Sequence, residues 1–208
     1  MSRNCTLRPL KPCLGHQLEL EIRELDASRF GDLEALFGTN DSANRCWCTW
    51  FVIAVKEYHA NGSFGNRERF CSMMATSKVP MGLLAYLKGE PVGWCAVGPR
   101  SRFARATKTP TLKGVDHAED DTVWFVPCFF VRGYWWRARV SPRLLQGAVG
   151  LAENHQATAI EGFPLTAGRR HTSDTQVGLE TVFRACGFRL VRQPSPGRVV
   201  MRLDLKSQ

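Results

Sequence analysis

The residues with the most evident chemistry form a basic and aromatic segment in the second half of the chain. Residues 132–140 read Arg-Gly-Tyr-Trp-Trp-Arg-Ala-Arg-Val, with no periodic pattern. Ser141 and Pro142 follow, and they suit the cap and the first turn of a helix. A loop that leads into a helix offers unpaired backbone N–H groups and the positive end of the helix dipole. The segment therefore predicts a phosphate or pyrophosphate site.

A second candidate is Glu161, the single acid in a predicted buried strand at residues 157–165. A carboxylate rarely enters a buried strand without a partner or a task. It could accept a proton as a general base, or it could form a structural ion pair, and the sequence does not choose. Asp116 and His117, in a long polar connection before the central strand, are alternative bases or simply solvated loop residues.

Eight cysteines are expected to be free thiols, because a chain of 208 residues with an ordinary core needs no disulfide framework. Cys46 and Cys48 are separated by one residue, whereas zinc sites usually separate paired cysteines by two to four residues and need four ligands. We therefore expect no metal. Cys128 could in principle carry an acyl group, but a thiol in an apolar strand is more often inert packing.

The elements that position these residues form one continuous unit. Residues 122–131 are almost all β-branched or aromatic, which predicts a strand buried on both faces. Pro127 cannot donate to a ladder, so we expect an interruption near Val126 and Pro127. The order strand, basic loop, helix, strand predicts parallel strands joined by a right-handed crossover.

The rest of the chain supplies further strands and helices around this unit. Residues 1–16 are expected to form a loose N-terminal arm, and residues 17–208 a single domain. We expect a strand at 18–22, a helix capped by Asp26 and ended by Gly38, a polar turn at 40–44, a loop at 61–65, a helix at 66–74, a hairpin of 81–87 with 92–97, a helix at 179–186 ended by Gly187, and a closing pair of 188–191 with 199–205.

Composition limits the class of protein. The apolar fraction of 44% is ordinary for a globular protein, and no run approaches the length of a membrane span or a signal peptide. We therefore expect a cytoplasmic protein without a membrane partner. The net charge of +9 (28 basic minus 19 acidic residues) favours anionic partners, but nucleic acid is disfavoured because no nucleic-acid motif is visible.

Three motifs carry a resemblance to a known family. The stretches Val126-Pro-Cys-Phe-Phe-Val-Arg132, Val140-Ser-Pro-Arg-Leu-Leu145 and Glu161-Gly-Phe-Pro164 resemble the central motif of the GNAT superfamily of N-acetyltransferases. The loop is similar to that of a bacterial branch that reads Val-Arg-Lys-Gly-Tyr-Arg-Gly-Arg-Gly-Val-Ser. It departs from that pattern, because Trp136 replaces the family arginine, and Arg137 and Arg139 replace two glycines. Glycine there would let the backbone approach a pyrophosphate closely.

The resemblance implies an α/β protein with the GNAT fold: a mixed sheet of about six to seven strands, flanked by helices, with splayed central parallel strands. It implies transfer of an acetyl group from acetyl-CoA, as co-substrate, to a primary amine of a small molecule or a protein lysine. A non-catalytic descendant that binds a ligand or a protein is the alternative. A homodimer is left open.

The resemblance also assigns residues to roles. The expected acetyl-CoA contacts are Phe129, Phe130, Val131, Trp136, Arg137, Ala138, Arg139, Val140 and Ser141. The expected wall of the acceptor pocket is Cys46, Trp47, Cys48 and Trp50, although the two tryptophans could instead fill the core. Tyr134, Trp135 and Trp136 could stack on adenine or cover the core. Phe183 stands where many relatives have a tyrosine acid, so that acid is absent.

Overall fold

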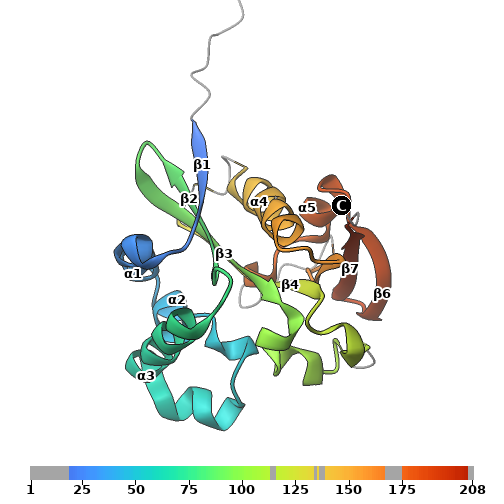
Figure 1. Cartoon of the computed structure of the whole chain (residues 1–208), viewed down its shortest axis with the longest axis horizontal. Coiled ribbons are helices and arrows are strands. Elements are labelled where there is room, and N and C mark those ends of the chain that lie inside the picture. The colour runs from blue at the N-terminus through green and yellow to red at the C-terminus, as the bar shows by residue number, and fades with distance from the viewer. Residues whose placement is uncertain (1–18, 113–115, 134, 136–138, 167–174, 206–208) are drawn as a thin grey trace, which may run out of the picture.

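A computed structural model describes residues 19–112, 116–133, 135, 139–166 and 175–205. Within these ranges the chain forms a seven-stranded sheet in the order β1-β2-β3-β4-β5-β7-β6 (Figure 1). The strands are β1 (Leu20–Glu24), β2 (Gly82–Leu87), β3 (Glu90–Pro99), β4 (Val123–Val131), β5 (Ala159–Gly162), β6 (Arg189–Ser195) and β7 (Arg198–Asp204). Neighbours are antiparallel except β4 and β5, which are parallel, as predicted.

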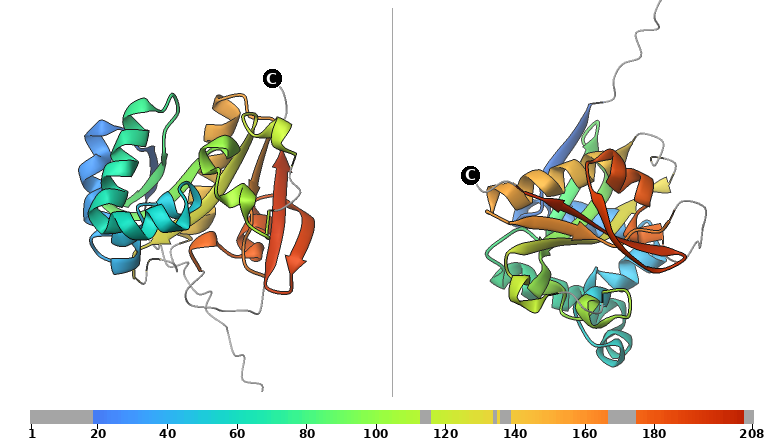
Figure 2. Two further views of the ribbon diagram at one scale, coloured as in Figure 1. Left: turned by 90° about the horizontal axis from the view of Figure 1, so that it is seen from below. Right: turned by 90° about the vertical axis from the view of Figure 1, so that its right-hand side faces the viewer.

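Helices cover both faces of the sheet. The α-helices are α1 (Phe30–Phe37), α2 (Asp41–Cys46), α3 (Val55–Thr76), α4 (Val140–Asn154) and α5 (Glu180–Ala185). The first three lie on one face and the last two on the other, which the views in Figures 1 and 2 make visible. Two hydrophobic cores result, one between the sheet and α1–α3, the other between the sheet and α4–α5. The mixed α/β architecture predicted from the sequence is confirmed.

The central strand β4 changes the face that its side chains present halfway along its length. Opposite β3, Val126 and Pro127 together occupy the place of one residue, which is a β-bulge. Trp124 and Val126 enter the α4–α5 core, whereas Cys128, just past the bulge, enters the opposite core. One extra residue inverts the two-residue alternation of a strand. The predicted interruption at Pro127 is thus confirmed, and it aims Cys128 toward α1–α3.

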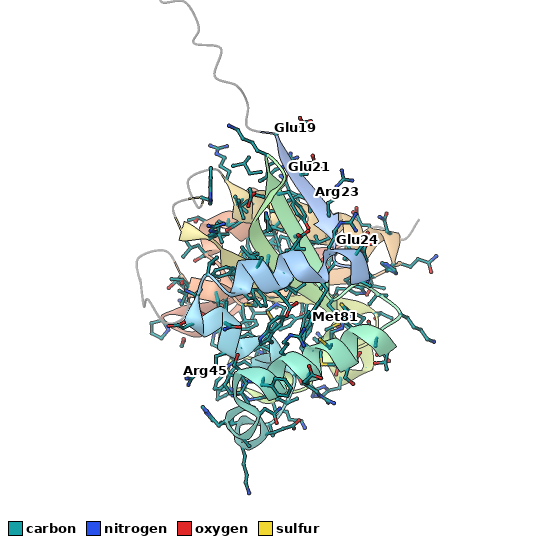
Figure 3. All side chains as sticks on the ribbon, turned by 90° about the vertical axis from the view of Figure 1, so that its left-hand side faces the viewer. Glu19, Glu21, Arg23, Glu24, Arg45 and Met81 are labelled. Carbon is teal, nitrogen blue, oxygen red and sulfur yellow. The ribbon has the colours of Figure 1, made fainter. Side chains whose placement is uncertain are left out.

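Several boundaries follow the local signals. Asp26 caps the turn before α1, which ends at Gly38, and Gly187 follows α5 with φ +88°. The edge strand β1 carries charged side chains along its length (Figure 3). Charge on an edge strand discourages pairing with another chain. No helix among the described residues is long and apolar enough to cross a membrane.

Three local expectations were wrong. Residues 40–44 do not form a turn, because the Asn40 side chain accepts from Ala43 N at 2.9 Å and starts α2. Residues 61–65 are not a loop but a kink at Gly62 inside α3, where φ is +60°. Ser141 does not cap α4, which already begins at Val140 after Arg139.

Asn66, where the sequence predicts a helix to begin, lies inside α3. It is fully buried, and it donates to the backbone oxygens of Arg45 at 2.9 Å and of Tyr58 at 3.3 Å. A buried amide can satisfy backbone oxygens that a kinked helix and a helix end leave unpaired. Asn66 therefore fastens α3 to the end of α2.

Candidate active site

The central parallel strands part at the middle of the sheet. Pairing of β4 with β5 ends at Val126 and Gly162, whereas β4 continues to Val131. The chain after β5 turns toward β7 and the segment before α5, since Leu165 bridges to Leu179 and Arg198. Half of β4 therefore has no β5 beside it. This divergence is the splay expected from the sequence.

The half of β4 that extends beyond its pairing with β5 presents backbone groups toward the gap. Arg132 N donates to Val92 O on β3 at 2.9 Å, and antiparallel strands pair alternate residues in this way. The N–H and C=O groups of Phe129 and Val131 therefore face away from β3, on the side that β5 has left. An extended chain with amide groups could pair with them as an added strand does.

Aromatic side chains line the deeper part of the gap. Phe183 of α5 is fully buried, and its ring lies where a Cβ on Gly162 would stand, at 2.4 Å. It meets Phe129 edge to face, with ring centroids 6.1 Å apart. A phenyl ring has no proton to donate, so Phe183 itself cannot act as an acid.

The N-terminus of α4 opens onto the same end of β4. Arg139 precedes the helix with φ +56°, a left-handed conformation that favours glycine. The resemblance places a family glycine at this residue, and the arginine keeps the conformation without it. Val140 is buried in the α4–α5 core, and Ser141 lies in the first turn. Trp136, Arg137 and Ala138 lie outside the described residues.

A pocket of about 540 Å³ adjoins this loop. Its lining combines aliphatic, charged and aromatic side chains from the β2–β3 turn and from the end of β4: Leu87, Lys88, Glu90, Val92, Arg132, Gly133 and Trp135. Trp135 also packs against the α4–α5 core, so both roles considered for it have a basis. Tyr134 lies outside the described residues.

The Cys46-Trp-Cys48 segment lies on the opposite face of β4. Trp47 and Cys48 both have left-handed backbones, with φ of +46° and +54°. Trp47 is only 2% exposed and packs among Phe30, Phe37 and Phe70. This placement matches the core alternative for Trp47. Its indole Nε1 is buried and has no hydrogen-bond partner among the residues that the structure describes.

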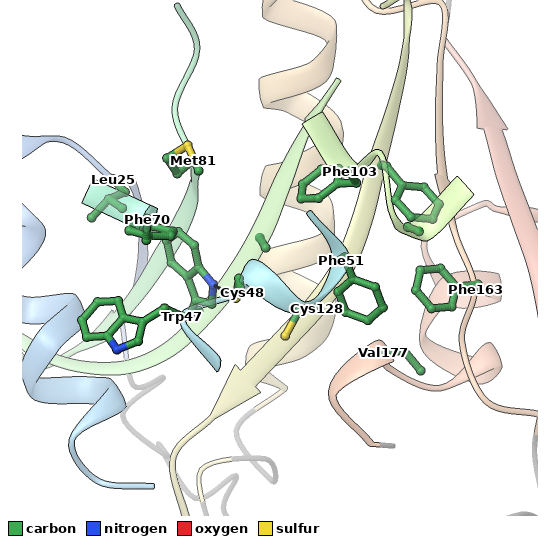
Figure 4. Packing of buried hydrophobic residues seen from close by; sticks show 14 of the residues in the cluster. Leu25, Trp47, Cys48, Phe51, Phe70, Met81, Phe103, Cys128, Phe163 and Val177 are labelled. Atoms are coloured by element: carbon green, nitrogen blue, oxygen red, sulfur yellow. Dashed lines mark hydrogen bonds between the residues drawn. The ribbon is translucent and has the colours of Figure 1, made fainter. Parts of the chain in front are cut away.

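Cys48 meets the central strand just past the bulge. Trp94 Nε1 donates to Cys48 Sγ at 3.2 Å, and Figure 4 shows Cys48 near Cys128. A hydrogen bond with Cys128 lowers the pKa of the Cys48 thiol, and the same contact together with burial raises the pKa of Cys128. Within the described ranges, no group of three or more cysteine, histidine or acidic side chains is placed to hold a metal ion.

Trp50 lies closer to the surface than Trp47. It follows Cys48 in a short 3-10 helix, η2 (Thr49–Phe51), and is half-buried. Its ring contacts Tyr58 edge to face at 4.9 Å, and Arg105 covers it at 3.8 Å. Burial and the neighbouring Cys46 thiol raise the pKa of Tyr58 to about 12. Tyr58 is therefore a neutral hydrogen-bonding group at ordinary pH.

Glu161 is held by two arginines. Its Oε2 accepts from Arg100 Nη1 at 3.1 Å, and its Oε1 accepts from Arg202 Nη1 at 3.0 Å. Arg100 is 1% exposed and also donates through Nε to Asp120 Oδ1 at 2.6 Å. A carboxylate with both oxygens engaged by guanidinium groups fits the ion-pair alternative. Its role as a base remains a prediction.

The other base candidates also have local partners. Asp116 accepts from Ala118 N at 2.9 Å, and its backbone oxygen accepts from Arg100 Nη2. His117 Nδ1 lies 2.8 Å from Asp120 Oδ2. Asp116 and His117 are therefore connected to Arg100, the first directly and the second through Asp120. The sequence did not predict this group of ion pairs and hydrogen bonds. The sequence predicts a short helix at residues 101–106, and the structure has the 3-10 helix η3 (Arg100–Phe103) there, but no motif marks Arg100 or Arg105 as part of a site.

No protein-family model matches the sequence, and no curated protein matches it. Solved structures do match. An acetyltransferase of the GNAT family from Streptococcus pneumoniae aligns with a TM-score of 0.52 and 14% identity, covering 90% of this chain and 100% of that one. A GCN5-related N-acetyltransferase from Kribbella flavida gives 0.52 and 17%, covering 89% and 98%.

Salmonella typhimurium yncA, solved with its cofactor acetyl-CoA, gives a TM-score of 0.53 and 13% identity, covering 91% of this chain and 95% of that one. These matches extend over nearly the whole of both chains, and they agree with the motifs at residues 126–132, 140–145 and 161–164. The chain has the fold of the GNAT N-acetyltransferases.

Proposed function

We propose that the protein transfers an acetyl group from acetyl-CoA to a primary amine of a small molecule or a protein lysine by direct attack. The observation that carries this proposal is the splay of β4 from β5 beside the N-terminus of α4. It leaves backbone groups of Phe129 and Val131 facing a gap. The N-terminus of α4, which is the positive end of the helix dipole, lies at the end of this gap. This arrangement suits an elongated ligand with amide groups and a pyrophosphate.

The residues of the chain would divide the work as follows. Phe129, Phe130 and Val131 would bind the pantetheine, and residues 136–141 the pyrophosphate. The bulge at Val126 and Pro127 changes the direction of the backbone N–H groups of β4. One of them could donate to the thioester oxygen as it gains negative charge. An amine with a pKa near ~10 must lose a proton before it attacks, and Glu161, Asp116, His117 or water would accept it.

Departure of the thiolate needs no dedicated acid. The CoA thiol has a pKa close to that of cysteine, ~8.5, so it can leave as the thiolate near neutral pH. Phe183 is thus compatible with turnover. A binding module without catalysis is the second candidate, favoured by the arginine that keeps the strained left-handed backbone at Arg139. Calorimetry with acetyl-CoA, followed by mass spectrometry of an amine panel, separates the two.

Binding of acetyl-CoA should depend on the arginines of the loop. We expect the double variant Arg137→Ala and Arg139→Ala to bind acetyl-CoA at least ~10-fold more weakly, since each guanidinium–phosphate contact is worth ~1 kcal/mol. Calorimetry at fixed salt measures this change. Lys56→Ala removes a remote surface charge and should leave the affinity unchanged. An unaltered Kd in the double variant would refute the assignment.

Arg139 can be tested for charge and backbone separately. Arg139→Gly should raise the free energy of unfolding by about 1 kcal/mol, because glycine adopts the left-handed conformation without the steric cost of a Cβ. The same variant should weaken acetyl-CoA binding, since it lacks the guanidinium. Urea denaturation and calorimetry report the two effects independently. Tighter binding of the glycine variant would mean that close backbone approach outweighs charge at this loop.

A further inference from the structure

Arg105 and Trp50 form a stacked pair on the α1–α3 side of the molecule. The guanidinium carbon of Arg105 lies 3.8 Å from the centroid of the Trp50 ring, and Arg105 Nη1 donates to the Trp50 backbone oxygen. Both side chains are half-buried, in contrast to the buried Trp47 nearby. The ring contact and the hydrogen bond together hold the guanidinium against Trp50, and Arg105 as a whole stays only partly buried. Arg105 is therefore held in one position but is not fully buried, so a ligand could reach it.

This cation lacks an acidic partner in the part of the chain that the structure describes. Its neighbours are Trp50, the Cys46 thiol and the Tyr58 phenol, and none of these is a carboxylate. Arg202, by contrast, contacts three carboxylates. Arg102 contacts no carboxylate among the described residues, but its guanidinium donates to four groups, namely three backbone oxygens and the Ser77 hydroxyl. Burial lowers the pKa of the Arg105 guanidinium. Desolvation without a counterion is a cost that a bound anion would offset.

The stacked pair is linked to the gap beside β4 through η2. Cys48 precedes η2 and meets Cys128 of β4, whereas Phe51 at its other end packs edge to face on Phe163, with centroids 5.4 Å apart. Phe163 directly follows Gly162, where β5 leaves β4. Trp50 lies between these two anchors in the sequence. A molecule with one end at the splay and the other at Trp50 would span η2.

We propose that Arg105 and Trp50 bind the carboxylate and the apolar body of the acceptor, so that the acceptor is an amine that also carries a carboxylate, such as an amino acid. This inference rests on the proposed acetyl transfer. A guanidinium fork matches a planar carboxylate, and the indole face of Trp50 offers apolar contact beside it. Arg45 adds positive charge near Tyr58, which further favours an anion.

The test compares matched acceptors that differ only in the carboxylate. Wild-type protein is given acetyl-CoA with phenylalanine, phenylalaninamide or phenethylamine, and with three ω-amino acids of increasing length and their amides. Acetylated amine is measured by mass spectrometry. We expect kcat/KM for the best carboxylate acceptor to exceed that of its amide by at least ~10-fold, and Arg105→Gln to remove that preference.

Three variants separate recognition from structure. Arg105→Gln should lower kcat/KM for the carboxylate acceptor ~10- to 100-fold, chiefly through KM, while the amide changes less than ~3-fold. Arg105→Lys keeps the charge but loses the forked geometry, so its kcat/KM for the carboxylate acceptor should lie between those of the wild type and Arg105→Gln. Lys108→Gln removes an exposed charge from the same segment and should behave as wild type. Acetyl-CoA affinity should be constant throughout.

Each outcome decides one point. Equal use of acids and amides by wild-type protein overturns the inference but leaves acetyl transfer intact. Equal loss for both classes in Arg105→Gln assigns Arg105 a structural role through the Trp50 backbone and also overturns it. If acetyl-CoA binds but no amine is acetylated, the proposed function fails and the inference fails with it.

Discussion

Replacing Glu161 with glutamine should lower the free energy of unfolding by about 3 kcal/mol. The change leaves Arg100, which is 1% exposed, and Arg202 without the charge that both guanidinium groups contact. Removing one partner of a buried ion pair typically costs about 3–5 kcal/mol, because the remaining charge is buried without compensation. Arg100 keeps Asp120 at 2.6 Å, which places the expected value at the lower end. Urea denaturation at neutral pH measures the loss.

Glu119→Gln is the matched control. Glu119 contacts Arg202 at 3.2 Å in the same network, but its side chain is 40% exposed, so its loss should cost less than about 1 kcal/mol. If Glu161 is instead the base, Glu161→Gln will remain as stable as wild type and bind acetyl-CoA equally well. Its turnover will fall, and the deficit will shrink as the pH rises. A stable, inactive variant would thus contradict the ion-pair interpretation.

The central unit could be predicted because its signals are local. The apolar run at 122–131 identified β4, Pro127 identified the bulge, and the residues after Arg139 identified α4. Each signal depends on residues within a few positions of one another, as strand and helix periodicities do. The two possible roles of Glu161, general base or member of an ion pair, could also be predicted, since a carboxylate in a buried strand needs a partner or a function.

The partners across the site could not be predicted, because they are far apart in the sequence. Arg100 meets Glu161 across 61 residues, and Arg105 meets Trp50 across 55. Arg100 begins the short 3-10 helix η3 (Arg100–Phe103) and Arg105 follows it, and neither arginine belongs to a sequence motif. Local errors had a similar cause. Gly62 kinks α3 instead of ending it, because the buried Asn66 amide fastens the helix to Arg45 on α2.

Truncating Trp47 should have the largest effect on stability of any single change near the proposed acceptor site. Trp47 is 2% exposed, and its ring packs against Phe30, Phe37 and Phe70 with centroids 5.3–6.0 Å away. Large-to-small substitution of a buried tryptophan usually costs about 3–5 kcal/mol, from lost transfer energy and the cavity left behind. We expect Trp47→Ala to unfold at markedly lower urea concentration.

Trp47→Phe distinguishes packing from a polar role. Within the described part of the chain the buried Nε1 has no hydrogen-bond partner, so phenylalanine removes an unsatisfied donor along with part of the ring. The net loss should therefore stay below about 1.5 kcal/mol. Trp50→Ala, at the half-buried position, should cost less stability than Trp47→Ala and instead alter the ranking of amine acceptors. If Trp47→Ala stays as stable as wild type and changes acceptor preference at constant acetyl-CoA affinity, then Trp47 is a wall of the pocket. If Trp47→Phe loses activity while remaining folded, the orphaned indole N–H serves a ligand and not the core.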